Sequence, residues 1–184
     1  RGDPPEDLIP QFELIRRAVD AFSVSRLELS GYEADDLIAT YSKFFTKKNW
    51  DISIISSDKD LMQLVGGNVY MLDPIKNKLI KEQEVIDKFG VPPEKVIDVQ
   101  SLAGDSIDNI PGAPGIGLKT GALLVNEYGS LENLLLNYSQ IKQNKRRESI
   151  EKNLDAINMS KKLVTLKDDI ELNIDINKIS DCAI

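Results

Sequence analysis

The spacing of apolar side chains predicts both helices and strands in the first half of the chain. Between residues 8 and 22 they recur every three or four positions, which predicts an amphipathic helix. A second helix is expected from Glu33 to about Lys48. Strands are predicted at 25–29, 51–57, 69–72 and 78–81, with the last two paired across a turn, and a short helix at 82–89 is closed by Gly90. This order of elements predicts an α/β layer over residues 1–91.

The second half predicts only helices. After the break at Val91-Pro92-Pro93, helices are expected from Pro93 to about Ala103, from Leu118, over 131–136 behind the N-cap Ser130, and over 149–166. Residues 170–174 form a short alternating segment. We therefore expect a helical domain over 92–184. Within it, Gly121 should weaken its helix by roughly 1 kcal/mol relative to alanine.

Composition narrows the chemistry. At 184 residues the chain can bury a sizeable core, and no apolar run approaches the roughly 18 residues of a membrane span, so no membrane partner is expected. The single cysteine excludes an internal disulfide and fits a reducing cytoplasm. The chain contains no histidine, which excludes His-based acid–base catalysis and His-ligated zinc.

The stretch 104–120 combines two kinds of chemistry. Asp105 and Asp108 are carboxylates of the type that holds hard cations such as Mg²⁺. A loop with Gly112, Gly115 and Gly117 follows and opens a helix, so its backbone N–H groups can face a phosphate. A metal site beside a phosphate grip indicates phosphodiester chemistry on a nucleic acid.

Two further acidic clusters lie at element ends. Helix capping explains any one of Glu33, Asp35 and Asp36 about as well as function does, but three in four positions repel one another unless a cation neutralises them. Asp58 and Asp60 follow a predicted strand, where open α/β sheets place their sites; a cap plus a solvated charge is the alternative. The basic run 142–147 is either a solvated helix face or a phosphate contact.

The net charge of −7 looks unsuited to a nucleic-acid partner. However, the three clusters contain seven carboxylates. Without them 23 acidic residues balance 23 basic ones, and two bound divalent ions would bring the net charge to −3. The acidic composition therefore does not exclude DNA.

Together these motifs resemble the flap endonuclease family, in particular the 5′-nuclease domains of bacterial DNA polymerases I. The resemblance covers residues 1 to about 166 and rests on Gly31-Tyr-Glu-Ala-Asp-Asp36, Ser57-Asp-Lys-Asp60 and the long motif 104–117. It implies a PIN-like α/β core followed by a helix–hairpin–helix, or helix–three-turn–helix, element at 104–128. It also implies cleavage of DNA at 5′ flaps, nicks and RNA primers, in a bacterial cytoplasm associated with the nucleoid, by a domain joined to a polymerase.

The resemblance implies two divalent ions, Mg²⁺ or Mn²⁺, and a role for each carboxylate. Glu33, Asp35, Asp36 and Asp58 correspond to the catalytic first metal site or its surroundings. Asp60, Asp105 and Asp108 correspond to the second, with Asp58 between the two. The DNA contacts would come from the loop glycines, Lys119, Thr120 and Arg1, and family members often hold a K⁺ in this hairpin.

The family also carries two upstream aspartates and an arch motif, of which Arg1 resembles the last residue. We therefore expect this chain by itself to be impaired as a nuclease, and restoring the upstream residues to restore cleavage. Two alternatives stay open: a non-catalytic DNA-binding module that uses only the helix–hairpin–helix, and an RNA-cleaving relative. The long glycine hairpin argues against the second.

Overall fold

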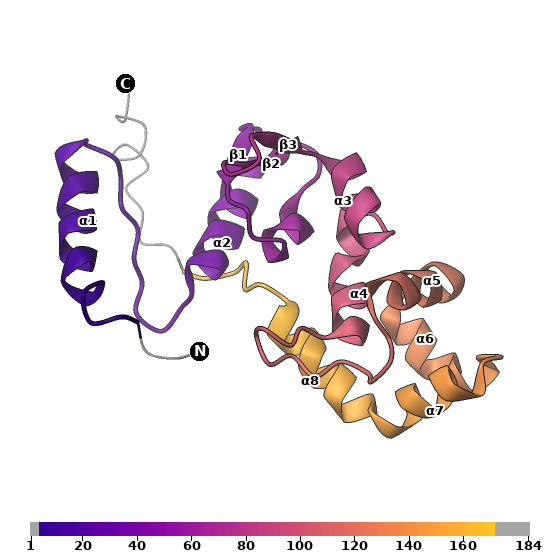
Figure 1. Cartoon of the computed structure of the whole chain (residues 1–184). Coiled ribbons are helices and arrows are strands. Elements are labelled where there is room, and N and C mark those ends of the chain that lie inside the picture. Colours follow the sequence, from indigo (N-terminus) through magenta and orange to yellow (C-terminus); the bar gives the residue numbers. More distant parts are fainter. Residues whose placement is uncertain (1–3, 172–184) are drawn as a thin grey trace.

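The computed structural model describes residues 4–171, and its first half is built on a small mixed sheet (Figure 1). Strand β1 (Ile52–Ile55) runs parallel to β2 (Val69–Asp73), and β2 pairs antiparallel with β3 (Lys78–Ile80) in the order β1-β2-β3. Helix α2 (Ala34–Thr46) packs against β1. The predicted strands at 69–72 and 78–81 and the helix after Glu33 are thereby confirmed.

The N-terminal part departs from the sequence prediction. Helix α1 (Ile9–Ala21) forms as expected, but none of its residues is buried, and it stands apart from the body in Figure 1. The predicted strand at 25–29 is wrong: in the described residues this segment pairs with no other strand. An extended segment becomes a strand only through hydrogen bonds to a neighbour. Strand β1, predicted to be buried, buries only one face, with Ile54 6% exposed and Ile55 67%.

The second half, over its described residues, consists of helices joined by loops. Helix α4 (Val96–Ala103), entered through the short 3₁₀ helix η2 (Pro93–Lys95), lies at its centre and packs against α5 (Leu118–Tyr128) and α8 (Leu154–Val164). Helices α6 (Leu131–Asn137) and α7 (Asn144–Lys152) complete the layer, joined by η3 (Tyr138–Gln140). The single helix predicted over 149–166 is wrong, because Asn153, with φ −126° and ψ 24°, separates α7 from α8.

Two helix ends follow their local signals. Helix α3 (Glu82–Phe89) ends at Gly90, whose φ of 75° is left-handed, and Ser130 caps α6 by accepting a hydrogen bond from the Asn133 N–H at 3.2 Å. One hydrophobic core extends through both halves. It includes Met71 of the sheet and Leu134 of α6, both fully buried. The two halves therefore pack as one body.

The loop between α4 and α5 is fixed by a close approach of two backbone segments. Asp105 and Ile110 exchange two backbone hydrogen bonds of 2.9 and 2.7 Å. The Gly112 N–H donates to the buried Ser160 hydroxyl on α8 at 2.9 Å. A Cβ on Gly104 would lie 2.5 Å from the Ile110 carbonyl oxygen, so no side chain fits there. The loop is thus anchored to both α4 and α8.

A second tie runs from the end of α8 back to the first half. We call residues 165–168 the strap. The Lys167 N–H donates to Asp36 Oδ1 at 2.8 Å, and the Thr40 hydroxyl donates to the Lys167 carbonyl at 3.1 Å. The Gln63 amide bonds both the Val164 carbonyl and the Leu166 N–H. The strap therefore holds α2, the residues after β1 and α8 together.

The close approach in the loop predicts that Gly104→Ala is strongly destabilising. Its φ of 67° and ψ of −178° suit only glycine, and the added methyl meets backbone, so we expect a loss of about 3 kcal/mol or more in the free energy of unfolding. Urea denaturation measures it. The control is Gly115→Ala, with φ 79° and open space around the methyl, which should cost only about 1–2 kcal/mol. Equal losses would contradict the packing argument.

Candidate metal centre

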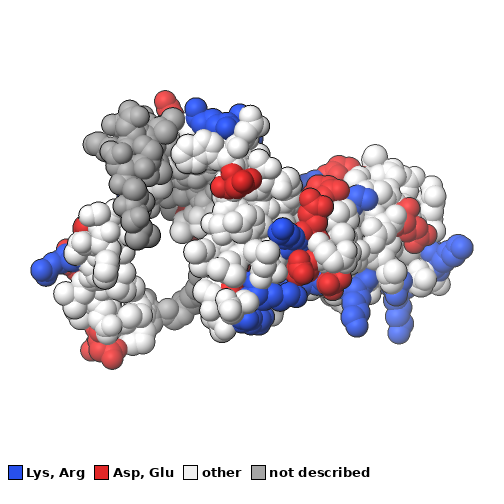
Figure 2. All heavy atoms as spheres, turned by 90° about the horizontal axis from the view of Figure 1, so that it is seen from above, with Lys and Arg blue, Asp and Glu red and all other residues white. Residues whose placement is uncertain are grey.

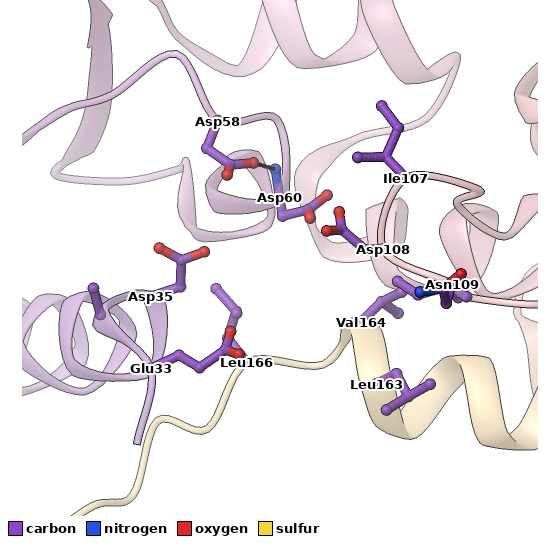
Figure 3. A pocket seen from close by; sticks show the side chains of 12 residues that line it. Glu33, Asp35, Asp58, Asp60, Ile107, Asp108, Asn109, Leu163, Val164 and Leu166 are labelled. Carbon is purple, nitrogen blue, oxygen red and sulfur yellow. Dashed lines mark hydrogen bonds between the residues drawn. The ribbon is translucent and has the colours of Figure 1, made fainter. Parts of the chain in front are cut away.

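Five of the seven candidate carboxylates line one cavity of about 690 Å³ at the junction of the two halves (Figure 3). They are Glu33, Asp35, Asp58, Asp60 and Asp108. Two come from the start of α2, two from the turn after β1 and one from the loop after α4. Segments far apart in sequence thus bring acidic side chains to one place, which the three separate motifs alone could not establish.

The local structure explains how the first four are aimed. Glu33 occupies the N-cap position of α2, but its side chain makes no capping hydrogen bond and so is left for the cavity. Asp58 does accept a hydrogen bond within its own turn, from the Asp60 N–H at 3.0 Å, as the capping alternative expects (Figure 3). Asp60 begins the 3₁₀ helix η1 (Asp60–Leu64). Both aspartates nevertheless line the cavity.

The opposite wall is apolar as well as acidic. The loop supplies Ile107, Asp108, Asn109 and Ile110, and the end of α8 with the strap supplies Leu163, Val164 and Leu166. Figure 3 shows Asp108 directed toward Asp60 from this wall. Carboxylates beside apolar groups lose part of their hydration, which makes their charge costly.

This cost raises the pKa values of two cavity carboxylates, Asp35 and Asp60. Burial, followed by repulsion from Asp58 and Asp60, raises the pKa of Asp35. Burial also raises the pKa of Asp60, although a hydrogen bond from Gln100 works against it. A divalent cation would relieve both the repulsion and the desolvation. The electrostatics of the cavity therefore favour a cation.

The remaining two candidates are engaged elsewhere. Asp36 accepts the hydrogen bond from the strap and does not line the cavity. The Asp105 side chain, 7% exposed, accepts from the Lys59 ammonium and from the Ile107 N–H at 2.8 Å. The hydrogen bond from Lys59 is the main reason that the pKa of Asp105 is lowered. Neither carboxylate lines the cavity, and both are held by groups of the protein itself.

In the part of the chain that the structure describes, no three acidic side chains are already grouped closely enough to hold one ion. The donor set nevertheless fits Mg²⁺ or Mn²⁺, because it offers only carboxylate oxygens, the ligands these ions prefer, and leaves room for water.

The predicted DNA contacts are placed unevenly. Gly115 and Gly117 have open space where a side chain would be, and Lys119 and Thr120 lie in the first turn of α5. Gly112 differs, since its N–H is already donated to Ser160. Arg1 lies outside the described residues.

The basic run 142–147 has a structural role in part. Its Arg147 donates hydrogen bonds to the Ile141 carbonyl and to Asn144, so it helps to hold α7. Figure 2 shows Lys and Arg side chains projecting along one side of the helical half.

Three residues at the site were not predicted from the sequence. Lys59 pairs with Asp105, Gln63 holds the strap, and Gln100 donates to Asp60 Oδ1 at 2.6 Å. In the sequence Lys59 lies between the candidate residues Asp58 and Asp60, and this position was a signal that it could belong to the site. Gln100 gave no such signal, because a polar residue in a helix is usually solvated.

Comparison with known proteins agrees with this architecture. A family profile for the N-terminal resolvase-like domain of 5′-3′ exonucleases matches residues 1–90, and one for their C-terminal SAM fold matches residues 91–183. The chain belongs to the 5′-3′ exonuclease family. The α/β core with a helical C-terminal region, inferred from the sequence, is thereby confirmed.

Relatives are either polymerases or separate nucleases. A DNA polymerase I of Rhizobium leguminosarum is 52% identical over 179 residues, which are 97% of this chain and 18% of that protein. A 5′-3′ exonuclease of Aquifex aeolicus is 37% identical over 95% of this chain and 59% of its own length. The chain thus spans about a fifth of the polymerase and under two thirds of the exonuclease.

Solved structures share the fold at low sequence identity. The T5 D15 protein co-crystallised with metal ions has a TM-score of 0.79 at 23% identity, over 91% of this chain and 64% of that one. The catalytic core of Rad2 in complex with a DNA substrate has a TM-score of 0.54 at 18% identity, over 98% of this chain and 65% of that one. In the residues the structure describes, no helix is long and apolar enough to cross a bilayer.

The acidity of the cavity predicts that Asp35→Asn stabilises the metal-free protein. The pKa of Asp35 is raised in the folded state, so its ionised form costs stability at neutral pH, and this cost disappears below the unfolded-state pKa of about 3.9. We expect a higher melting temperature for Asp35→Asn at pH 7 in EDTA, with the difference shrinking toward pH 4. The exposed Asp51→Asn should change little. A lower melting temperature for Asp35→Asn would contradict the assignment.

For Asp105 we expect the opposite effect: its ionised form stabilises the folded protein. Its pKa is lowered by Lys59, so the pair stabilises the fold above the unfolded-state pKa and the contribution is lost as the pH falls through the lowered value. Lys59→Met should cost about 1–2 kcal/mol at pH 7, between the values for exposed and buried pairs. Urea denaturation of the double variant Lys59→Met/Asp105→Asn should show part of this loss recovered. No recovery would mean that Lys59 acts through other contacts.

Proposed function

We propose that this chain is the metal- and DNA-binding part of a 5′ nuclease that hydrolyses DNA phosphodiester bonds at 5′ flaps, nicks or RNA primers. The observation that carries the proposal is the cavity in which carboxylates from three separate motifs meet. Family membership and the printed names of relatives, DNA polymerase I and 5′-3′ exonuclease, support the substrate class. On the same basis we propose a polymerase as the partner in the full protein and the nucleoid as its place of action.

Two divalent ions, Mg²⁺ or Mn²⁺, are the proposed cofactors. The five cavity carboxylates would hold them, with Asp58 between the two positions. Asp36 and Asp105 would join only after leaving the strap and Lys59, or would act from behind the ligands. When bound, such ions supply a water nucleophile at neutral pH and offset charge on the leaving oxygen.

The chain's own groups would orient the DNA around this centre. Gly115 and Gly117 present open backbone, and Lys119 and Thr120 add a charge and a hydroxyl at the N-terminus of α5. The same loop carries Asp108 into the cavity. One rigid segment therefore couples the phosphate grip to the metal ligands, and it positions DNA without reading its sequence.

The test is cleavage of an end-labelled 5′-flap duplex with Mg²⁺ or Mn²⁺, with EDTA as the control. The chain is assayed by itself and extended by the upstream residues of the family, which we expect to raise cleavage. In the extended protein Asp108→Asn should lower cleavage by about a hundredfold or more, since it weakens the hold on the cation that would stabilise negative charge in the transition state. Asp155→Asn, an exposed change on α8, is the matched control.

Binding of the flap should survive Asp108→Asn, because the loop glycines and Lys119 are unchanged. An extended protein that binds Mn²⁺ and flap DNA without cutting would contradict the nuclease assignment. Cleavage that persists in EDTA would contradict the role of the carboxylates.

A further inference from the structure

Gln100 is a buried amide that contacts one of the cavity carboxylates from behind. It lies on α4, is 3% exposed and does not line the cavity. Its Nε2 donates to Asp60 Oδ1 at 2.6 Å, across 40 residues of sequence. The helical half of the molecule thus reaches one carboxylate of the first half through a single side chain.

The other end of this amide is unsatisfied. In the part of the chain that the structure describes, Gln100 Oε1 is the one buried side-chain polar atom without a hydrogen-bond partner. Burying an acceptor without a partner is costly. Two other buried positions of α4, Val99 and Leu102, carry apolar side chains. A methionine of similar shape would avoid the cost. The hydrogen bond from the Gln100 amide to Asp60 is therefore the feature that accounts for a polar side chain at this buried position.

The donated bond constrains Asp60 in a useful way. An amide N–H that holds Oδ1 fixes the rotation of the carboxylate and leaves the other oxygen for the cavity. The arrangement resembles the outer hydrogen bonds that orient metal ligands in proteins, whose loss typically weakens metal binding by 10–100-fold. The Asp60 N–H is also held, by Asp58 at 3.0 Å, so both ends of the residue are fixed.

We propose that Gln100 is a positioning residue, which orients Asp60 toward a divalent cation in the cavity. The inference rests on the proposed function, because it requires that the cavity binds such an ion. It assigns to α4 a part in building the centre, although α4 supplies none of the cavity carboxylates.

The test is Gln100→Met in the full 184-residue chain, with Mn²⁺ as the probe. Isothermal titration of the folded protein should show Mn²⁺ affinity reduced by about tenfold. Urea denaturation without metal should show stability that is unchanged or higher, because the orphan acceptor is gone. A merely structural role predicts the reverse: lower stability with unchanged affinity. Gln100→Leu offers the same comparison if methionine packs badly.

Ser101→Ala is the matched control. Ser101 is the next residue on α4, is fully buried and donates to the Ile97 carbonyl of its own helix at 2.6 Å. Its loss should leave Mn²⁺ affinity unchanged. Equal Mn²⁺ affinity of Gln100→Met and the unsubstituted chain would overturn the inference and leave the proposed function standing. Failure of the unsubstituted chain to bind Mn²⁺ would overturn the proposed function, and the inference with it.

Discussion

Repulsion between carboxylates is the constraint under which the whole arrangement is built. Five acidic side chains from distant parts of the sequence share one cavity, and burial adds to the cost of their charges. Such a cluster persists only if the surrounding structure is held together by other forces. The hydrophobic core that runs from the sheet to α6 supplies most of that force, with α4 at its centre.

Three polar contacts around the cavity each hold a different carboxylate. Gln100 holds Asp60, Lys59 holds Asp105, and the strap holds Asp36. Each of these bonds fixes a carboxylate from outside the cavity and leaves the cavity itself acidic. A centre of this kind gives up stability in the metal-free protein in exchange for a place where a cation is strongly favoured.

Local signals in the sequence were sufficient for many elements but not for their environment. Gly90 and Ser130 marked helix ends correctly, because each acts through hydrogen bonds within a few residues. The segment 25–29 has strand character yet no strand partner, and pairing is a tertiary property that composition cannot show. The break at Asn153 was likewise hidden within a continuous apolar pattern.

For the candidate site too, local sequence signals identified residues, but not their tertiary contacts. The acidic motifs identified the carboxylates, but their convergence in one cavity depends on packing between the halves. Gly121 illustrates the limit well. Its helix cost is visible in sequence, but its reason is not: a methyl there would lie 3.3 Å from the Val99 carbonyl oxygen, so glycine lets α5 approach α4. Gln100 and Gln63 were missed for the same reason, since the partners of both amides lie far away in the sequence and only the tertiary structure brings them together.

The strap has a consequence for the order in which this protein is made. It joins residue 167 to Asp36 and Thr40, so the chain between them must be synthesised before those hydrogen bonds can form. The sheet and the helices can begin to fold while the ribosome is still adding residues, but this wall of the cavity closes only after the strap has left the exit tunnel. The acidic centre is therefore among the last features of the described chain to assemble, and a nascent chain passes through a stage that has the core without a completed centre.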